Sequence, residues 1–119
     1  MHYEIKFYKL SSGKCPVQNF LDELDYKMRA KILRMMLLLK ENGNDLREPY
    51  SKYLEEGLFE LRAKQGTNIT RVLYFFMFDK EIIITHGFVK KTQKTPRAEI
   101  ELAKKYRKDY IARKESVNV

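Results

Sequence analysis

The sequence has very little cysteine and no long apolar run, and both absences exclude classes of protein. Cys15 is the single cysteine among 119 residues, so no disulfide can form within the chain, which suits a reducing compartment. No apolar stretch approaches the length of about 18 residues that a membrane-spanning helix needs. The N-terminus also lacks the charged start and apolar middle of a signal peptide. We therefore expect a cytoplasmic protein that does not contact a membrane.

The remaining composition fits one globular domain. Hydrophobic residues make up 44% of the chain and aromatic residues 13%, which is enough for a compact core. No linker, repeat or low-complexity tract divides the chain, so we expect residues 1–119 to form a single domain.

The positive charge is concentrated in the second half of the chain. Residues 1–57 carry ten Lys/Arg against nine Asp/Glu, a balance of +1, and residues 58–119 carry fourteen against seven, a balance of +7. Such a field attracts a polyanion. The alternative is that the surplus lysines only keep a small protein soluble, and charge alone does not decide between these two.

The first half of the chain predicts one strand and two helices. Residues 3–9 alternate between apolar and polar, as in a strand with one buried face. A short helix follows over 16–24, and a longer one runs from its cap at Asp25 to a stop at Gly43. The apolar stripe of the longer helix consists of Met28, Ile32, Met35, Met36 and Leu39. Leu37 and Leu38 lie outside this stripe, so we expect additional burial there, by a second helix or by a bound partner.

The second half predicts three strands and a final helix. Residues 44–57 are turn-rich, and strand patterns follow over 58–64, 68–78 and 81–90. Short loops make these three strands an antiparallel meander. Thr95-Pro96 then begins a helix that reaches about residue 114. The predicted fold is α+β, in the order β-α-α-β-β-β-α, with the helices on one face of a mainly antiparallel sheet.

Cationic side chains are predicted to meet on the open face of this sheet. Alternation along the strand at 58–64 directs Phe59 and Leu61 toward the helices and Arg62 away from them. Pairing of the next two strands brings further cations to the same surface. The candidate catalytic residues are Arg62, Arg71, Lys90, Lys91 and Lys94. The candidate RNA-binding residues are Lys64, Tyr53 and His86.

Converging cations of this kind suit a phosphodiester. Arginine can hold two nonbridging oxygens, whereas lysine supplies a compact charge whose pKa falls when other cations surround it. If the 2′-hydroxyl of RNA attacks the adjacent phosphorus, fixed cations stabilise the added charge of the transition state. This route needs no cofactor, and no His/Asp/Glu cluster has the spacing of metal ligands, so we predict no metal.

Each candidate also has a purely structural interpretation. Arg62 can pair with a neighbouring acid such as Glu60, and Arg71 can form an ion pair at a strand edge. The lysines near residue 90 can form a solvated loop, and His86 can be a packed, hydrogen-bonded strand histidine. Tyr53 can stack on a base or simply cover the core.

Three segments resemble the phage-derived, HigB-like branch of the RelE/ParE toxin superfamily. They are Leu58-Phe-Glu-Leu-Arg62, Asn68-Ile-Thr-Arg71-Val-Leu-Tyr-Phe-Phe76, and Ile84-Thr-His-Gly-Phe-Val-Lys-Lys-Thr-Gln-Lys-Thr-Pro96. The resemblance implies a RelE-like fold and a toxin of a type II toxin–antitoxin pair. It also implies cleavage of mRNA on the ribosome, inhibition of translation and neutralisation by a HigA-like helix-turn-helix antitoxin, in a complex that is a higher hetero-oligomer. It maps functional cations onto Arg62, Arg71, Lys90, Lys91 and Lys94. We assign phosphate clamping to the two arginines, and RNA placement and proton transfer to the lysines; the general base stays unassigned.

Two other functions fit the same sequence. A ParE-like toxin that inhibits gyrase would share the fold, and a non-catalytic nucleic-acid-binding module would need only the basic half of the chain. The segment 88–96 favours the ribonuclease branch.

Overall fold

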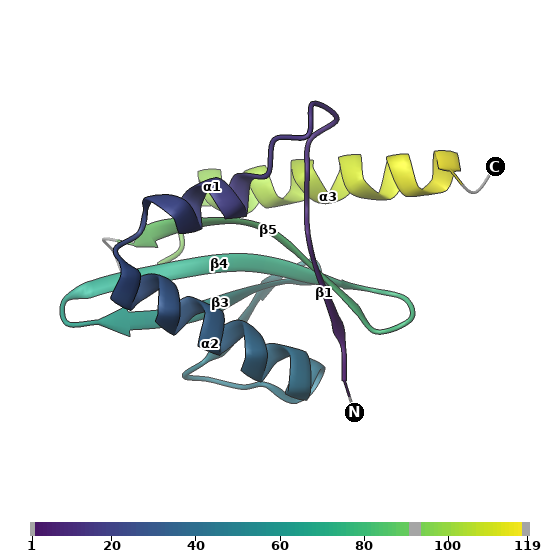
Figure 1. The fold of residues 1–119 in the computed structure, drawn as a ribbon. Helices are drawn as coiled ribbons and strands as arrows, with labels where there is room; N and C mark the ends of the chain where they lie inside the picture. Colours follow the sequence, from purple (N-terminus) through teal and green to yellow (C-terminus); the bar gives the residue numbers. More distant parts are fainter. Residues whose placement is uncertain (1, 91–93, 118–119) are drawn as a thin grey trace.

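The computed structural model describes residues 2–90 and 94–117, with side chains up to residue 116. A five-stranded sheet in the order β1-β5-β4-β3-β2 forms its centre (Figure 1). The strands are β1 Glu4–Phe7, β2 Ser51–Glu55, β3 Leu58–Gln65, β4 Asn68–Met77 and β5 Glu81–Lys90. The helices are α1 Pro16–Glu23, α2 Tyr26–Asn42, the one-turn 3₁₀ helix η1 Gly43–Asp45 and α3 Arg97–Val117. None of the helices in the described ranges is long and apolar enough to cross a membrane.

The predicted α+β fold is confirmed, and one strand was missing from the prediction. β3, β4 and β5 form the expected antiparallel meander, and β1 joins it in parallel to β5. The missed strand is β2, which pairs antiparallel with β3 at the edge of the sheet, with Ser51 opposite Leu61 and Glu55 opposite Leu58. Its sequence, Ser-Lys-Tyr-Leu-Glu, has only weak alternation, because an edge strand can leave polar side chains in solvent.

Helices cover both faces of the sheet. The prediction placed the helices on one face, and α1 and α2 do pack there, over side chains such as Leu61, Val72 and Tyr74. α3 instead packs on the opposite face, over Leu73 and Phe75, a face that the prediction left open. The reason is that β4 and β5 are apolar at both even and odd positions, so each face needs a cover.

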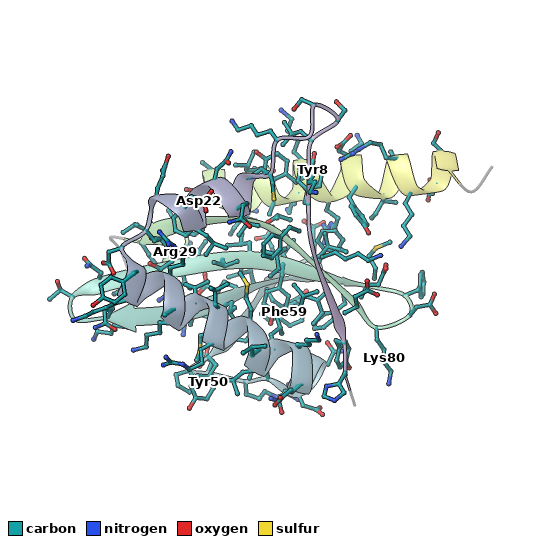
Figure 2. The ribbon with its side chains drawn as sticks, in the orientation of Figure 1. Tyr8, Asp22, Arg29, Tyr50, Phe59 and Lys80 are labelled. Atoms are coloured by element: carbon teal, nitrogen blue, oxygen red, sulfur yellow. The ribbon has the colours of Figure 1, made fainter. Side chains whose placement is uncertain are left out.

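The ends of the helices confirm the predicted start and stop signals. Asp25 caps α2 by accepting a 3.0 Å hydrogen bond from the Met28 backbone N–H. Gly43 ends α2 with a φ of +51°, and a side chain there would collide with the Tyr3 ring. Arg29, labelled in Figure 2 where α1 meets α2, donates hydrogen bonds to three backbone carbonyls of the 21–24 segment.

Gly87 allows α1 to approach the sheet closely. A Cβ atom at this position would lie 2.5 Å from the ring of Phe20, which comes from α1. Gly87 therefore contributes close packing, and it does so within the same strand that carries Lys90 at its end.

Candidate active site: cations around Glu60

Three cations from three neighbouring strands converge on the carboxylate of Glu60. Arg62 of β3 lies directly opposite Arg71 of β4, and Lys90 ends β5 opposite Ile69. Oε2 of Glu60 lies 3.0 Å from Nε of Arg62, 3.3 Å from Nε of Arg71 and 4.0 Å from Nζ of Lys90. The predicted convergence of these three residues therefore occurs in the structure.

Glu60 is completely buried, and a residue near the start of α3 also binds it. Its exposed fraction is 0%, and its second oxygen, Oε1, accepts a hydrogen bond from the Thr95 hydroxyl. A buried carboxylate needs such partners, because charge without compensation is strongly disfavoured in the protein interior. One carboxylate against three cations leaves two formal positive charges in the cluster, so its capacity to hold an anion is not exhausted.

Burial lowers the pKa of two of these cations. The pKa of Lys90 lies below its ordinary value, mainly because the side chain is buried; the Glu60 carboxylate opposes this effect, and Arg71 and Arg62 add to it. The pKa of Arg71 is lowered in the same way, by burial first and by Arg62. Lys90 is 4% exposed and Arg71 9% exposed, so both are held in a desolvated environment where an incoming anion would be bound strongly.

Arg71 retains unused hydrogen-bonding capacity. Its Nη1 donates to the Thr70 carbonyl at 3.2 Å, and its buried Nε forms an ion pair with Glu60 Oε2 at 3.3 Å without the geometry of a hydrogen bond. An acceptor oxygen supplied by a ligand would complete the hydrogen bonding of this donor.

Two hollows flank the cluster. The larger has a volume of about 500 Å³, and its charged lining includes Lys52, Glu60, Lys90, Lys94 and Arg97. The smaller, of about 330 Å³, is lined by Arg62 and Arg71 together with Lys64 and Tyr50. A phosphodiester chain lying across the cluster would thus meet cations in both hollows.

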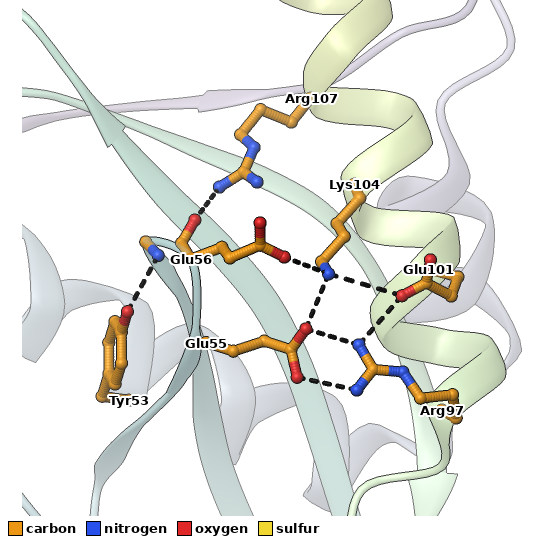
Figure 3. A network of polar contacts seen from close by, with 8 residues as sticks. Tyr53, Glu55, Glu56, Arg97, Glu101, Lys104 and Arg107 are labelled. Carbon is orange, nitrogen blue, oxygen red and sulfur yellow. Dashed lines mark hydrogen bonds and ion pairs between the residues drawn. The ribbon is translucent and has the colours of Figure 1, made fainter.

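The N-terminal half of α3 forms one wall of the larger hollow and is fastened to the β2–β3 hairpin. Figure 3 shows Arg97 donating to both carboxylate oxygens of Glu55, at 2.8 and 2.5 Å, and Lys104 donating to Glu55 at 2.6 Å. These two cations hold the pKa of Glu55 at about 2, well below its ordinary value. Arg107 also donates to the Glu56 carbonyl, so the helix contacts the tip of the hairpin at several points.

Two other predicted site residues, Lys94 and Tyr53, line the larger hollow. Lys94 is exposed, and Tyr53 is 54% exposed and contacts the ring of Phe59 edge-on. Lys64 is exposed beside Arg62, and its carbonyl accepts from Lys31. Lys91 lies outside the described residues.

His86 is separated from the cluster by burial under α3. It is 5% exposed, its Nε2 lies 3.2 Å from Glu99 Oε1 and its Nδ1 lies 3.2 Å from the Thr85 hydroxyl. Burial lowers its pKa, against the opposing effect of Glu99. The side chain therefore links β5 to α3 and does not line either hollow.

The sequence prediction missed the central position of Glu60 and the contribution of Thr95. Glu60 was considered only as a surface partner of Arg62, although its place between apolar neighbours in β3 was a signal that it could be buried. Thr95 was assigned only to the start of α3. Among the described residues, no group of three or more His, Cys, Asp or Glu side chains is arranged to hold a metal ion.

Comparison with known proteins identifies the family. No curated protein sequence matches the chain. A chain of the archaeal RelE-RelB complex from Pyrococcus horikoshii OT3 has a similar structure, with a TM-score of 0.52 and 25% sequence identity over 80% of this chain and 100% of that chain. Residues 19–108 match the family model described as phage derived protein Gp49-like (DUF891). The chain therefore belongs to the Gp49-like family, and the predicted membership of the RelE-type toxin superfamily is confirmed.

Proposed function

We propose that this protein is the toxin of a type II toxin–antitoxin pair and acts in the cytoplasm as a metal-independent endoribonuclease on mRNA. The observation that carries the proposal is the meeting of Arg62, Arg71 and Lys90 beside two cation-lined hollows. The match to the RelE-RelB complex supports a protein antitoxin, for which we propose a HigA-like helix-turn-helix protein in a higher hetero-oligomer.

The proposed reaction uses the RNA's own hydroxyl as nucleophile. The 2′-oxygen attacks the adjacent phosphorus, the bond from phosphorus to the 5′-oxygen breaks, and the products are a 2′,3′-cyclic phosphate and a 5′-hydroxyl. Arg62 and Arg71 would hold the nonbridging oxygens, whose negative charge grows in the transition state. The 2′-hydroxyl gives up one proton to a base, and the 5′-oxygen takes up one from an acid.

Lys90 is the proposed acid. Its lowered pKa brings its proton closer to transfer near neutral pH, and it lines the larger hollow together with Lys94, to which we assign the placement of the RNA. Exposed Tyr53 and Lys64 are proposed to contact the flanking nucleotides. Direct contact of His86 with RNA would require α3 to uncover it, so we propose that His86 positions α3 against β5.

The test is to induce the protein in cells and to map the 5′ ends of mRNA. Cleavage on translating ribosomes predicts cuts in phase with codons. We expect Arg71→Ala to slow cleavage roughly 100-fold, the size of effect seen when one group that stabilises transition-state charge is removed. Arg34→Ala, at an exposed position of α2, is the matched control and should cut like the wild type.

Three further measurements test this function: the folding of the variants, cleavage in EDTA and damage to DNA. Because Arg71 is buried, circular dichroism must show that Arg71→Ala folds. Lys94→Ala, at an exposed position of the larger hollow, is a second variant that should also cut RNA more slowly. Purified protein should still cut RNA in EDTA wherever ribosomes are intact or not required. Intact transcripts combined with cleaved DNA and stalled replication would instead indicate a gyrase-inhibiting toxin.

A further inference from the structure

A third hollow of the molecule is apolar and lies between β1 and α2. It has a volume of about 810 Å³, and its apolar lining consists of Ile5, Phe7, Leu33, Met36 and Leu37. Leu33 and Leu37 are one helical turn apart on α2, with exposed fractions of 44% and 61%. We call this the β1–α2 groove. Two adjacent leucines exposed to this degree in a groove are typical of a protein interface.

The β1–α2 groove lies away from the cation cluster. It is on the face of the sheet that α1 and α2 cover, whereas Glu60 and its cations lie on the face of α3. It is also at the β1 edge of the sheet, and the cluster spans β3, β4 and β5. α2 also lines the smaller cation-lined hollow, through Lys31 and Met35, but neither residue lines the groove. A protein segment confined to the groove would therefore leave both cation-lined hollows open.

The charge around the groove selects the kind of partner. α2 carries five Lys/Arg against the single acid Glu41, and the lysines that line the groove are Lys6, Lys9 and Lys40, with no acidic residue among the lining residues that the structure describes. Lys6 is already paired with Glu81 at 2.5 Å. A second copy of this chain would set one basic α2 against another, whereas an acidic segment would complement both the leucines and the lysines.

We propose that the β1–α2 groove is an anchor for the antitoxin, filled by a segment that carries leucine-type side chains flanked by Asp or Glu. The proposal rests on the proposed toxin function and adds to it that binding and inhibition are separable. The groove supplies affinity, and a different part of the antitoxin, or its bulk, must keep RNA from the cations around Glu60.

Titration calorimetry measures binding of the proposed helix-turn-helix antitoxin to the wild type and to variants of the groove. RNA cleavage is measured with the same proteins. We expect Leu37→Asp to weaken binding at least tenfold, because it places a like charge and an unsatisfied carboxylate against the acidic segment. Lys40→Glu should weaken binding less and make it less sensitive to salt. Both variants should cleave RNA at the wild-type rate and escape neutralisation in cells.

The matched control is Phe78→Asp in the β4–β5 turn, where the native side chain is 89% exposed, more than any other large apolar side chain that the structure describes. It should bind like the wild type, and circular dichroism should show that all three variants fold.

Unchanged binding of Leu37→Asp would overturn the groove proposal alone. Self-association of the wild type that Leu37→Asp abolishes would overturn it in favour of a second copy. If the wild-type protein did not bind the antitoxin at all, the proposed antitoxin and the groove assignment would both be wrong. The RNA-cleavage assay tests the ribonuclease proposal separately.

Discussion

Glu60 is the residue on which the candidate active site depends. Three cations that each lie within 4.0 Å of one Glu60 oxygen would repel one another in a buried environment, and this carboxylate lowers that cost while leaving a net positive charge for a ligand. It also connects the strands to the start of α3, because the Thr95 hydroxyl donates to it. In the proposed reaction Glu60 therefore acts through the cations that it positions, and we do not expect it to contact the RNA.

Glu60→Gln tests this role through stability. The amide keeps the shape and can still accept from Thr95, but it leaves three cations without their counter-charge, so we expect the free energy of unfolding to fall by roughly 3 kcal/mol. Urea denaturation measures this change. Glu48→Gln is the matched control, since Glu48 lies 4.0 Å from Arg62 but is 61% exposed, and should change stability by less than about 0.5 kcal/mol. Equal effects of the two substitutions would contradict a special role for Glu60.

α3 is the element whose position completes the site. Its first turns carry Arg97 and Lys104, which hold Glu55 at the end of β2, and its later turns carry Lys114, which binds Glu81 at 2.6 Å. Its middle packs Ile100 and Ala103 onto the sheet. The wall of the larger hollow thus depends on ion pairs at the edge of the sheet as well as on apolar packing.

The ion pairs of Glu55 predict a pH dependence. The pKa of Glu55 is held at about 2 against an ordinary value of 4.5, so its stabilising effect is complete above pH 4.5 and is lost as the pH falls toward 2. Glu55→Gln should therefore melt at a lower temperature than the wild type near neutral pH, and the difference should shrink through this range. Thermal unfolding of both proteins at each pH isolates the contribution of Glu55, because every other carboxyl group titrates in both proteins.

Glu101→Gln is the control for that comparison. Glu101 contacts the same two cations, but all three residues belong to α3, so its loss should leave the docking of the helix unchanged. A difference between wild type and Glu55→Gln that stayed constant from neutral pH down to pH 2 would mean that packing, and not the ion pair, explains the effect of the substitution.

The sequence predicted the elements well where one local signal decided the structure. Asp25 and Gly43 gave correct boundaries for α2, because helix capping depends on single residues. β2 and the position of α3 depend on contacts distant in sequence. The apolar residues at both even and odd positions of β4 and β5 indicated that both faces need a cover, but not which helix provides it. The convergence of Arg62, Arg71 and Lys90 followed from strand alternation, whereas the burial of Glu60 followed from packing against α3.

At the scale of the whole molecule, the positive charge extends beyond the cluster around Glu60. The cations of the cluster lie on the α3 face of the sheet. α2 carries five Lys/Arg on the other face, of which Lys31 lines the smaller hollow beside Arg62 and Arg71, and Lys40 lines the β1–α2 groove. The excess of Lys/Arg in residues 58–119 indicated only the cations around Glu60. The basic character of α2 did not show in the charge balance, because acidic residues elsewhere in residues 1–57 offset the Lys/Arg of α2. These positions suit two different polyanionic partners, RNA at the cations around Glu60 and an acidic protein segment at the β1–α2 groove.

Binding to RNA should depend on salt through the cation cluster and not through the surface as a whole. A 2′-O-methyl oligonucleotide lacks the attacking hydroxyl, so its affinity can be measured without cleavage over a range of salt concentrations. Each phosphate contact to a single strand contributes a slope of roughly −0.7 to the plot of log affinity against log salt. Arg62→Gln and Lys94→Gln should each reduce the slope by about that amount and weaken binding similarly for different sequences.

Lys80→Gln is the matched control for these variants. Lys80 is exposed in the turn of the β4–β5 hairpin, at the opposite end of that hairpin from Lys90, and is labelled in Figure 2. Its removal lowers the net charge by the same single unit as the other two substitutions, but it lies outside both cation-lined hollows. If Lys80→Gln reduced the slope as much as Arg62→Gln did, RNA would be held by net charge alone, and the cluster around Glu60 would not be its binding site.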